Sequence, residues 1–157
     1  MALDQRFQDK NYILSCGWGN VLHHLRKQFD LWAIDRLANK GYKGFKMTYM
    51  PVIMNIDSNG TNNNDLALRA KVTKQAMSKV IKELQKSGYI SSKTDPKDKR
   101  STIFKLTSRG EGLIQCAKKS VSELMDEYRK LVGKKNYDDL LIQLVTIIEH
   151  MDKKLND

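Results

Sequence analysis

The stretch 74–87 has an apolar spacing that predicts an α-helix. One face of this helix carries lysines and uncharged polar side chains but no acid. The polar positions are Lys74, Gln75, Ser78, Lys79 and Lys82. A solvated helix face usually mixes acids and bases, because opposite charges four residues apart attract each other. Cations with amide and hydroxyl groups instead suit phosphates and the edges of bases. The pattern favours contact with nucleic acid, and an ordinary solvated face stays open as the alternative.

A second group of cations lies at the tip of a predicted β-hairpin in the stretch 91–107. These cations are Lys97, Lys99 and Arg100. Such a tip can lie along the backbone of a duplex, and an arginine is favoured in a narrow minor groove, where negative potential is concentrated. Asp98 would hold the Arg100 guanidinium in one rotamer through paired hydrogen bonds, and Asp95 with Pro96 would shape the turn. A solvated turn is the alternative.

The excess of positive charge is concentrated in the middle of the chain. The whole sequence has a net charge of +10, and residues 61–110 hold 12 Lys/Arg against 4 Asp/Glu, a net of +8. A basic block inside a folded segment favours a polyanion as partner, with nucleic acid first and a membrane surface second.

Motifs for catalysis are not found in the sequence. It has no Gly-rich phosphate loop, no G-x-S-x-G and no H-E-x-x-H, so we expect neither an enzyme nor a cofactor. The three histidines, His23, His24 and His150, lack the spacing of metal ligands, and no metal site is predicted. Cys16 and Cys116 are predicted to be inert thiols, with redox sensing by Cys16 as the alternative.

At 157 residues, the chain is long enough for one compact domain with its own core. No run of about 18 apolar residues is present, and the N-terminus lacks the features of a signal peptide, so we expect a cytoplasmic protein without a membrane span.

Hydrophobic spacing and turn residues predict the order of the elements. The first forty residues are expected to be mainly helical, with helices following at 46–56, 64–70, 74–87, from Thr107 or Ser108 to Gly133, and at 137–155, and with strands at 89–94 and 101–106. Pro51 should kink the helix 46–56 or mark its first turn. The stretch 57–64 is expected to be a turn. Ala76, Val80, Ile81 and Leu84 are expected to form the buried stripe of the helix 74–87.

Two short helices joined by a tight turn and followed by a two-stranded hairpin make a winged helix-turn-helix. The predicted fold is therefore mainly α with a small β-hairpin wing. In a helix-turn-helix the second helix enters the major groove of DNA. We expect a DNA-binding lobe at 43–110. The last predicted helix is too apolar to remain without a partner, and a second copy of the chain is the simplest one.

The stretch 65–110 closely resembles the MarR family of bacterial transcriptional regulators. The matching pieces are "LA" at 66–67, "VTKQAMSKVIKELQKSGYI" at 72–90, "DKRS" at 98–101 and "LTSRG" at 106–110. The resemblance implies a homodimer, with a helical dimerisation region at 1–42 and 111–157, that binds a pseudo-palindromic operator in double-stranded DNA, typically as a repressor. A non-regulatory nucleic-acid-binding module is the alternative. The predicted DNA-contacting residues are Thr73, Lys74, Gln75, Ser78, Lys79, Lys82, Lys97, Asp98, Lys99, Arg100 and Ser101. Those on the helix 74–87 with Thr73, together with Asp98 and Arg100, match positions of the family, and the others are neighbouring residues of the wing.

The resemblance also implies two modes of regulation. Members of the family often bind small aromatic molecules in a cleft beside the DNA-binding lobe, and the candidate residues here are Trp18, His24, Trp32, Tyr49 and Phe45. Aromatic residues at helical spacing are also typical of a core, which is the alternative. A subset of the family senses peroxides through an N-terminal cysteine near tyrosines, and Cys16, four residues after Tyr12, resembles that arrangement.

Overall fold

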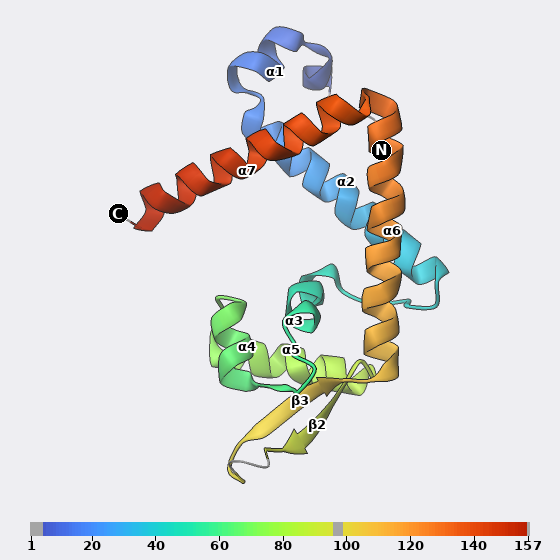
Figure 1. Cartoon of the computed structure of the whole chain (residues 1–157), viewed down its shortest axis with the longest axis vertical. Coiled ribbons are helices and arrows are strands. Elements are labelled where there is room, and N and C mark those ends of the chain that lie inside the picture. Colours follow the sequence, from blue (N-terminus) through green and yellow to red (C-terminus); the bar gives the residue numbers. More distant parts are fainter. Residues whose placement is uncertain (1–4, 96–98, 157) are drawn as a thin grey trace. The chain divides into compact units, whose positions relative to one another are not determined.

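The computed structural model describes residues 5–95 and 99–156 (Figure 1). The chain divides into two compact units, Met1–Ala117 and Lys118–Asp157. In the described residues the structure is mostly helical with one small antiparallel sheet, which confirms the predicted fold class.

Helices make up the start of the first unit. A 3-10 turn, η1 (Gln5–Gln8), precedes α1 (Lys10–Cys16) and the long α2 (Trp18–Asn39). The Asp9 carboxylate caps α1 by accepting from the backbone N–H groups of Asn11 and Tyr12. Gly17 separates the two helices, and a Cβ there would lie 2.7 Å from the Ile13 Cα, so only glycine fits this close approach. The predicted helical start of the chain is confirmed.

The helix expected at 46–56 is shorter than predicted. The structure has a 3-10 turn, η2 (Met47–Tyr49), followed by a helix of five residues, α3 (Met50–Met54). Pro51 lies in the first turn of α3, where the missing N–H has no helical acceptor and the fixed φ angle favours the helix. The proline therefore marks the start of α3 and does not kink a longer helix.

The helix-turn-helix consists of α4 (Asn63–Arg69) and α5 (Lys74–Lys86). Asn62 caps α4 by accepting from the Asp65 N–H at 2.9 Å, and Thr73 caps α5 by accepting from the Ala76 N–H at 3.2 Å. Gly88, with φ at +72°, follows the end of α5 and turns the chain toward the sheet. The helices predicted at 64–70 and 74–87 are thereby confirmed, each within one residue of its bounds.

The sheet has three strands, and the predicted wing had two. β2 (Ile90–Thr94) and β3 (Thr102–Leu106) form the hairpin, and β1 (Thr61–Asn62) pairs with the other edge of β3, opposite Phe104 and Ile103. The prediction of a turn at 57–64 was therefore wrong for its second half, where residues 61–62 form β1 and α4 begins at Asn63. Two residues are too few to show an alternating pattern, and the pairing of β1 depends on a strand forty residues later.

The core of the first unit lies beneath the helix-turn-helix, where α4 lies beside α5 and α5 packs on β2 (Figure 1). From α5 it takes Met77, Ile81 and Leu84, of which Met77 is completely buried, whereas Ala76 is exposed and Val80 is half-buried. The predicted stripe was thus shifted by about one position at its start. The long Met77 side chain fills more core volume than Ala76, and its spacing to Ile81 and Leu84 is equally helical.

Two helices carry the rest of the chain, α6 (Ser108–Val132) and α7 (Lys134–Asn156). Thr107 caps α6 by accepting from the Gly110 N–H, and its hydroxyl is also 2.6 Å from the Gly88 carbonyl oxygen, to which it donates. Gly133, with φ at +88°, separates the two helices. α7 begins three residues before the predicted Tyr137, whose N–H is bonded to the Gly133 carbonyl.

Candidate nucleic-acid interface

The recognition helix α5 presents its polar face to solvent. Lys74, Gln75, Lys79 and Lys82 are exposed, whereas Ser78 is half-buried. The Ser78 hydroxyl donates to the Lys74 carbonyl at 2.8 Å and accepts from the Asn63 amide at 3.2 Å. Ser78 therefore links α5 to the start of α4, while its neighbours on the same face remain accessible.

A shallow hollow, which we call the helix hollow, follows this face. Its volume is about 520 Å³, and its lining consists of Thr73, Gln75, Ala76, Ser78, Lys79 and Lys82. Five of the six residues predicted on the recognition helix line it, and Lys74 does not. Within the described residues, no acid belongs to the lining, so the hollow offers cations, an amide and hydroxyl groups to a ligand.

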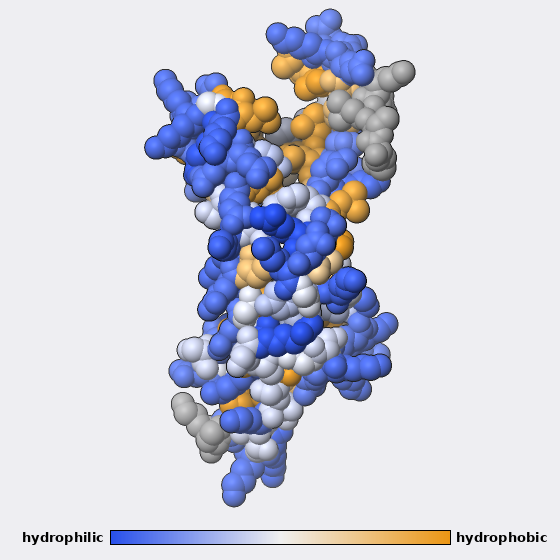
Figure 2. Space-filling view, turned by 90° about the vertical axis from the view of Figure 1, so that its right-hand side faces the viewer, coloured by the Kyte–Doolittle hydropathy of each residue, from blue (hydrophilic) through white to orange (hydrophobic). Residues whose placement is uncertain are grey.

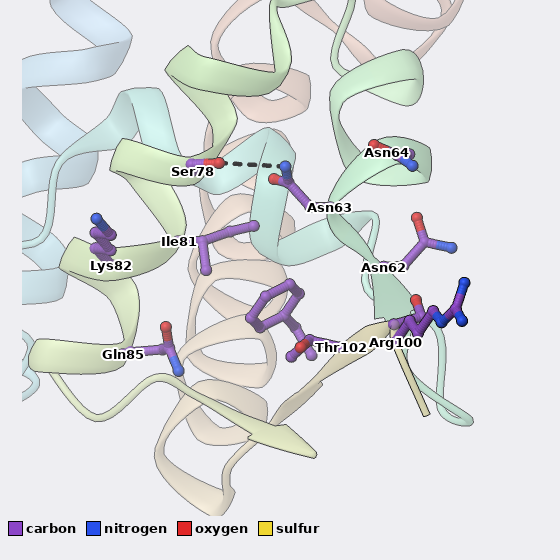
Figure 3. Close-up of a pocket in the computed structure, with 11 residues that line it drawn as sticks. Asn62, Asn63, Asn64, Ser78, Ile81, Lys82, Gln85, Arg100 and Thr102 are labelled. Carbon is purple, nitrogen blue, oxygen red and sulfur yellow. Dashed lines mark hydrogen bonds between the residues drawn. The ribbon is translucent and has the colours of Figure 1, made fainter. Parts of the chain in front are cut away.

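A second hollow, which we call the wing pocket, lies between α5, the start of α4 and the β3 side of the wing (Figure 3). Its volume is about 390 Å³. It is lined by Asn62, Asn63, Asn64, Ser78, Ile81, Lys82, Gln85, Arg100, Ser101, Thr102 and Phe104. The two hollows share Ser78 and Lys82, so a continuous polar surface runs from the recognition helix to Arg100 of the wing.

Residues of the wing pocket that the sequence analysis missed come mostly from the asparagine run 62–64 and from Gln85. Asn63 donates from its amide to Ser78 and, at 3.4 Å, to the Lys74 carbonyl, while its own Oδ1 is buried and has no hydrogen-bond donor among the described residues. Gln85 follows Lys82 by three residues and Ser78 by seven, a helical spacing that could have placed it on this face. The asparagines were assigned only to a turn and a cap.

The wing is described on both sides of its tip. β2 and β3 are paired from Ile90 with Leu106 to Thr94 with Thr102, and the Asp95 N–H continues the hairpin by donating to the Ser101 carbonyl at 2.9 Å. Lys99 and Arg100 are exposed, and Ser101 is half-buried. Lys97 and Asp98 lie outside the described residues, and so does the predicted bond between Asp98 and Arg100.

The acid of the recognition helix, Glu83, is paired away from the polar face. Its carboxylate accepts hydrogen bonds from Lys46 at 2.8 Å and from the Tyr49 hydroxyl of η2. These bonds lower the pKa of Glu83, and the same cluster raises the pKa of Lys46. Both groups therefore stay charged near neutral pH, and the negative charge of Glu83 is neutralised locally.

The structure does not bring all the aromatic effector candidates together. Trp18 and Trp32 lie fourteen residues apart on α2, a distance of about 21 Å along a straight helix. The His24 ring lies 5.1 Å from that of Phe7, and Trp32 lies 5.8 Å from Phe29. Tyr49 is near Phe45, with ring centres 6.3 Å apart, and these two belong with the core of the first unit.

Cysteines and metal ligands add little to the site. Cys16 is the last residue of α1, and its side chain lies outside the described part of the structure, while Cys116 is half-buried. Within residues 5–95 and 99–156, no group of three metal-binding side chains comes together. Among the helices of these residues, none combines the length and apolarity that a bilayer span requires.

Comparisons with known proteins place these features in one family. A model of the MarR family matches residues 43–101, which include the helix-turn-helix and most of the wing. The transcriptional regulator YvnA of Bacillus subtilis is 27% identical over 87% of this chain and 78% of its own length. The regulator BilQ of Clostridioides difficile is 24% identical over 79% of this chain and 82% of its own.

A solved structure shows the same architecture on DNA. The transcriptional repressor CouR, bound to a 23-mer DNA duplex, has a TM-score of 0.60 and 25% identity, covering 85% of this chain and 96% of the CouR chain. The matched proteins are transcriptional regulators rather than enzymes. The winged helix-turn-helix of this chain therefore belongs to the MarR family of DNA-binding transcriptional regulators.

Proposed function

We propose that this regulator is a homodimeric repressor that binds a pseudo-palindromic operator and is released by a small-molecule effector. The observation that carries the proposal is the continuous polar surface formed by the helix hollow and the wing pocket, whose described linings contain no acid. Uniform positive charge with amide donors suits phosphates and base edges. The transcriptional repressor CouR, which has a similar fold, was solved bound to a DNA duplex.

The proposed contact residues lie on this surface or next to it in the sequence. In the DNA-binding lobe, 43–110, α5 enters the major groove with Lys74, Gln75, Lys79 and Lys82 toward the bases and phosphates. Thr73 and Ser78 act mainly by fixing the helix, because their hydroxyl groups are already bonded within the protein. Arg100, with Lys97, Lys99 and Ser101, approaches the adjacent minor groove or its phosphates.

Dimerisation is supported by apolar side chains that remain exposed in the single chain. Figure 2 shows exposed hydrophobic surface as orange patches among hydrophilic blue. In the dimerisation region, 1–42 and 111–157, α7 exposes Leu140, Leu141, Ile142, Val145, Ile147, Ile148, Met151 and Leu155, and α1 and α2 expose Leu14, Trp18, Leu22, Leu25, Leu31 and Ile34. Exposed apolar side chains in such number on each of these segments are typical of an interface. A two-fold dimer would present two wings and two recognition helices to a two-fold symmetric operator.

Release of the operator by a small aromatic molecule is the proposed mode of regulation, with candidate contacts among Trp18, His24, Trp32 and Tyr49. Within one chain Trp18 and Trp32 are too far apart on α2 to contact the same small molecule. Redox sensing by Cys16 is kept as a second hypothesis. Tyr12 lies one helical turn before Cys16, and its hydroxyl accepts from the Asn20 amide at 2.5 Å, which ties this tyrosine of α1 to α2.

One experiment tests these proposals together. Duplexes bound by the full chain are selected from a genomic pool, and the release of the selected duplex is then measured with aromatic acids, phenols and peroxide. The proposal predicts an enriched duplex with two related half-sites, loss of binding when one half-site is scrambled, and release by an aromatic compound. Enrichment of a single unpaired site would contradict the dimeric mode. If peroxide releases the wild type but not the Cys16→Ser variant, the redox hypothesis replaces the aromatic effector.

A further inference from the structure

The wing pocket lies where one particular part of a bound duplex has to pass. A major groove and the minor groove next to it are separated by a single sugar–phosphate strand. If α5 lies in the first groove and the wing tip in the second, then the surface that joins them faces this strand. The wing pocket is that surface, because it is lined by Lys82 and Gln85 of α5 and by Arg100 of the wing.

The chemistry of the lining fits a phosphodiester. Figure 3 shows Lys82 and Gln85 on one side of the pocket, with Asn62, Asn64 and Arg100 on the other. Ile81 and Phe104 form a buried apolar floor between them. Lysine, arginine and amide side chains all donate hydrogen bonds, and phosphate oxygens only accept them. Among the described residues of the lining there is no carboxylate to repel an anion.

Several of these donors are available for a ligand. Lys82 and Asn64 are exposed and have no hydrogen-bond partner among the described residues. Gln85 uses one amide hydrogen in a bond of 3.0 Å to the Ser92 hydroxyl, which orients the side chain and leaves its second amide hydrogen free. Asn62, in contrast, is held by Asp65 through the α4 cap, so it shapes the wall of the pocket.

The back of the pocket is already ordered. The Asn63 amide joins Ser78 and the Lys74 carbonyl, which fixes the spacing between α4 and α5. A buried acceptor without a donor, such as Asn63 Oδ1, is a typical position for an ordered water, and protein–DNA interfaces are rich in bridging waters. A pocket whose walls are fixed before binding loses little conformational entropy when the ligand enters.

We propose that the wing pocket seats the sugar–phosphate strand between the two grooves, with Lys82, Gln85 and Asn64 donating to its phosphate oxygens. The inference rests on the proposed function and extends the interface beyond the residues that the family resemblance implies. The pocket recognises the phosphodiester whatever the base, so it sets the register of α5 and of the wing and contributes affinity without sequence preference.

Three single variants test the seat on the selected operator duplex and on a scrambled duplex of equal length. Asn64→Ala, Gln85→Ala and Lys82→Ala are each expected to weaken both complexes by about two- to tenfold, so that the ratio of the two affinities stays unchanged. Lys86→Ala is the matched control, because Lys86 is an exposed lysine of α5 outside both linings. Ser92→Ala removes the hydrogen-bond partner of Gln85 in β2. It shows whether the loss in Gln85→Ala comes from a contact with the duplex or from the bond that ties α5 to β2.

Replacing single phosphates by uncharged methylphosphonates locates the contact. The seat predicts a short cluster of phosphates where substitution weakens wild-type binding, and a smaller loss at the same positions with Gln85→Ala or Asn64→Ala. Equal losses in wild type and variants at every position would overturn the seat. The seat would also be overturned if inorganic phosphate at constant ionic strength released the duplex from the wild type but not from Lys82→Ala. The pocket would then bind a free anion.

The seat and the proposed function fail in different ways. If the wild type selects no duplex, the proposed function fails. If it binds its selected duplex with the expected salt dependence while all three variants bind as tightly as the wild type, only the seat is overturned.

Discussion

The hydroxyl of Tyr49 donates a hydrogen bond to the carboxylate of Glu83, and Lys46 donates to the same carboxylate at 2.8 Å. The cluster ties η2 to the recognition helix α5 and turns the acid of that helix away from its polar face. It therefore serves two purposes, since it positions α5 and leaves the helix hollow without an acid in its described lining.

This cluster predicts an acid-sensitive contribution to stability. The bonds from Lys46 and Tyr49 hold the pKa of Glu83 below its ordinary value of 4.5 in the folded chain. The contribution is therefore complete above pH 4.5 and is lost as the pH falls through the lower, folded-state pKa. Thermal unfolding followed from pH 7 to pH 3 should show a smaller acid-induced fall in Tm for Glu83→Gln than for the wild type. Glu149→Gln, on the exposed surface of α7, is the control and should behave as the wild type. Parallel curves for wild type and Glu83→Gln would argue against the cluster.

Burial predicts which leucines of the helix-turn-helix support the fold. Leu84 of α5 is 1% exposed and Leu68 of α4 is 78% exposed. Leu84→Ala should lower the free energy of unfolding by about 2–5 kcal/mol, because it leaves a cavity in the core. Leu68→Ala should change it by less than about 0.5 kcal/mol. Urea denaturation at one fixed protein concentration measures both, and similar losses for the two variants would contradict the core described above.

The sequence could predict those parts of the fold that depend on local patterns. The elements with caps and helical periods, such as α5 with Thr73 and Gly88, were predicted with nearly their observed bounds. The pairing of β1 with β3 was not predicted, because two residues carry no pattern and the pairing is long-range. On α5 the choice between Ala76 and Met77 as the first buried residue depended on volumes in the core, to which helical spacing alone is blind.

The candidate site was predicted in the same uneven way. The cations of the recognition helix follow from charge sign and spacing, which are local properties. The sequence did not predict that Asn63 and Asn64 line the wing pocket. Their position depends on α4 and α5 packing side by side, which brings the Asn63 amide within hydrogen-bond distance of the Ser78 hydroxyl. The salt bridge from Lys46 to Glu83 spans thirty-seven residues and was equally hidden.

The wing predicts a large effect from one arginine. Arg100→Ala should weaken binding of the selected duplex by about 1–3 kcal/mol if its side chain reaches the groove. Arg100→Lys should recover only part of the loss, since lysine lacks the planar fork of guanidinium. Lys118→Ala, an exposed lysine of α6, is the control in the same fluorescence anisotropy titration. An unchanged affinity for Arg100→Ala would remove the wing from the interface.

The apolar face of α7 predicts the oligomeric state. Ile148 is 58% exposed in the single chain, so Ile148→Asp should leave the monomer folded while it weakens the dimer by placing a charge in an apolar interface. Sedimentation velocity over a range of concentrations should show a shift from dimer toward monomer. Gln143→Asp introduces the same side chain at a polar, exposed position of α7 and should leave the dimer intact. A wild-type chain that sediments as a monomer at every concentration would contradict the proposed assembly.

The salt dependence of duplex binding tests the central claim, that the cations of α5 and the wing bind DNA phosphates. The logarithm of the association constant is measured against the logarithm of the salt concentration for wild type, Lys79→Ala and Lys82→Ala. The account predicts a steep, linear fall for the wild type, with a slope that decreases by about 0.9 for each lysine that contacts a phosphate. A flat dependence in the wild type, or slopes that both substitutions leave unchanged, would contradict it.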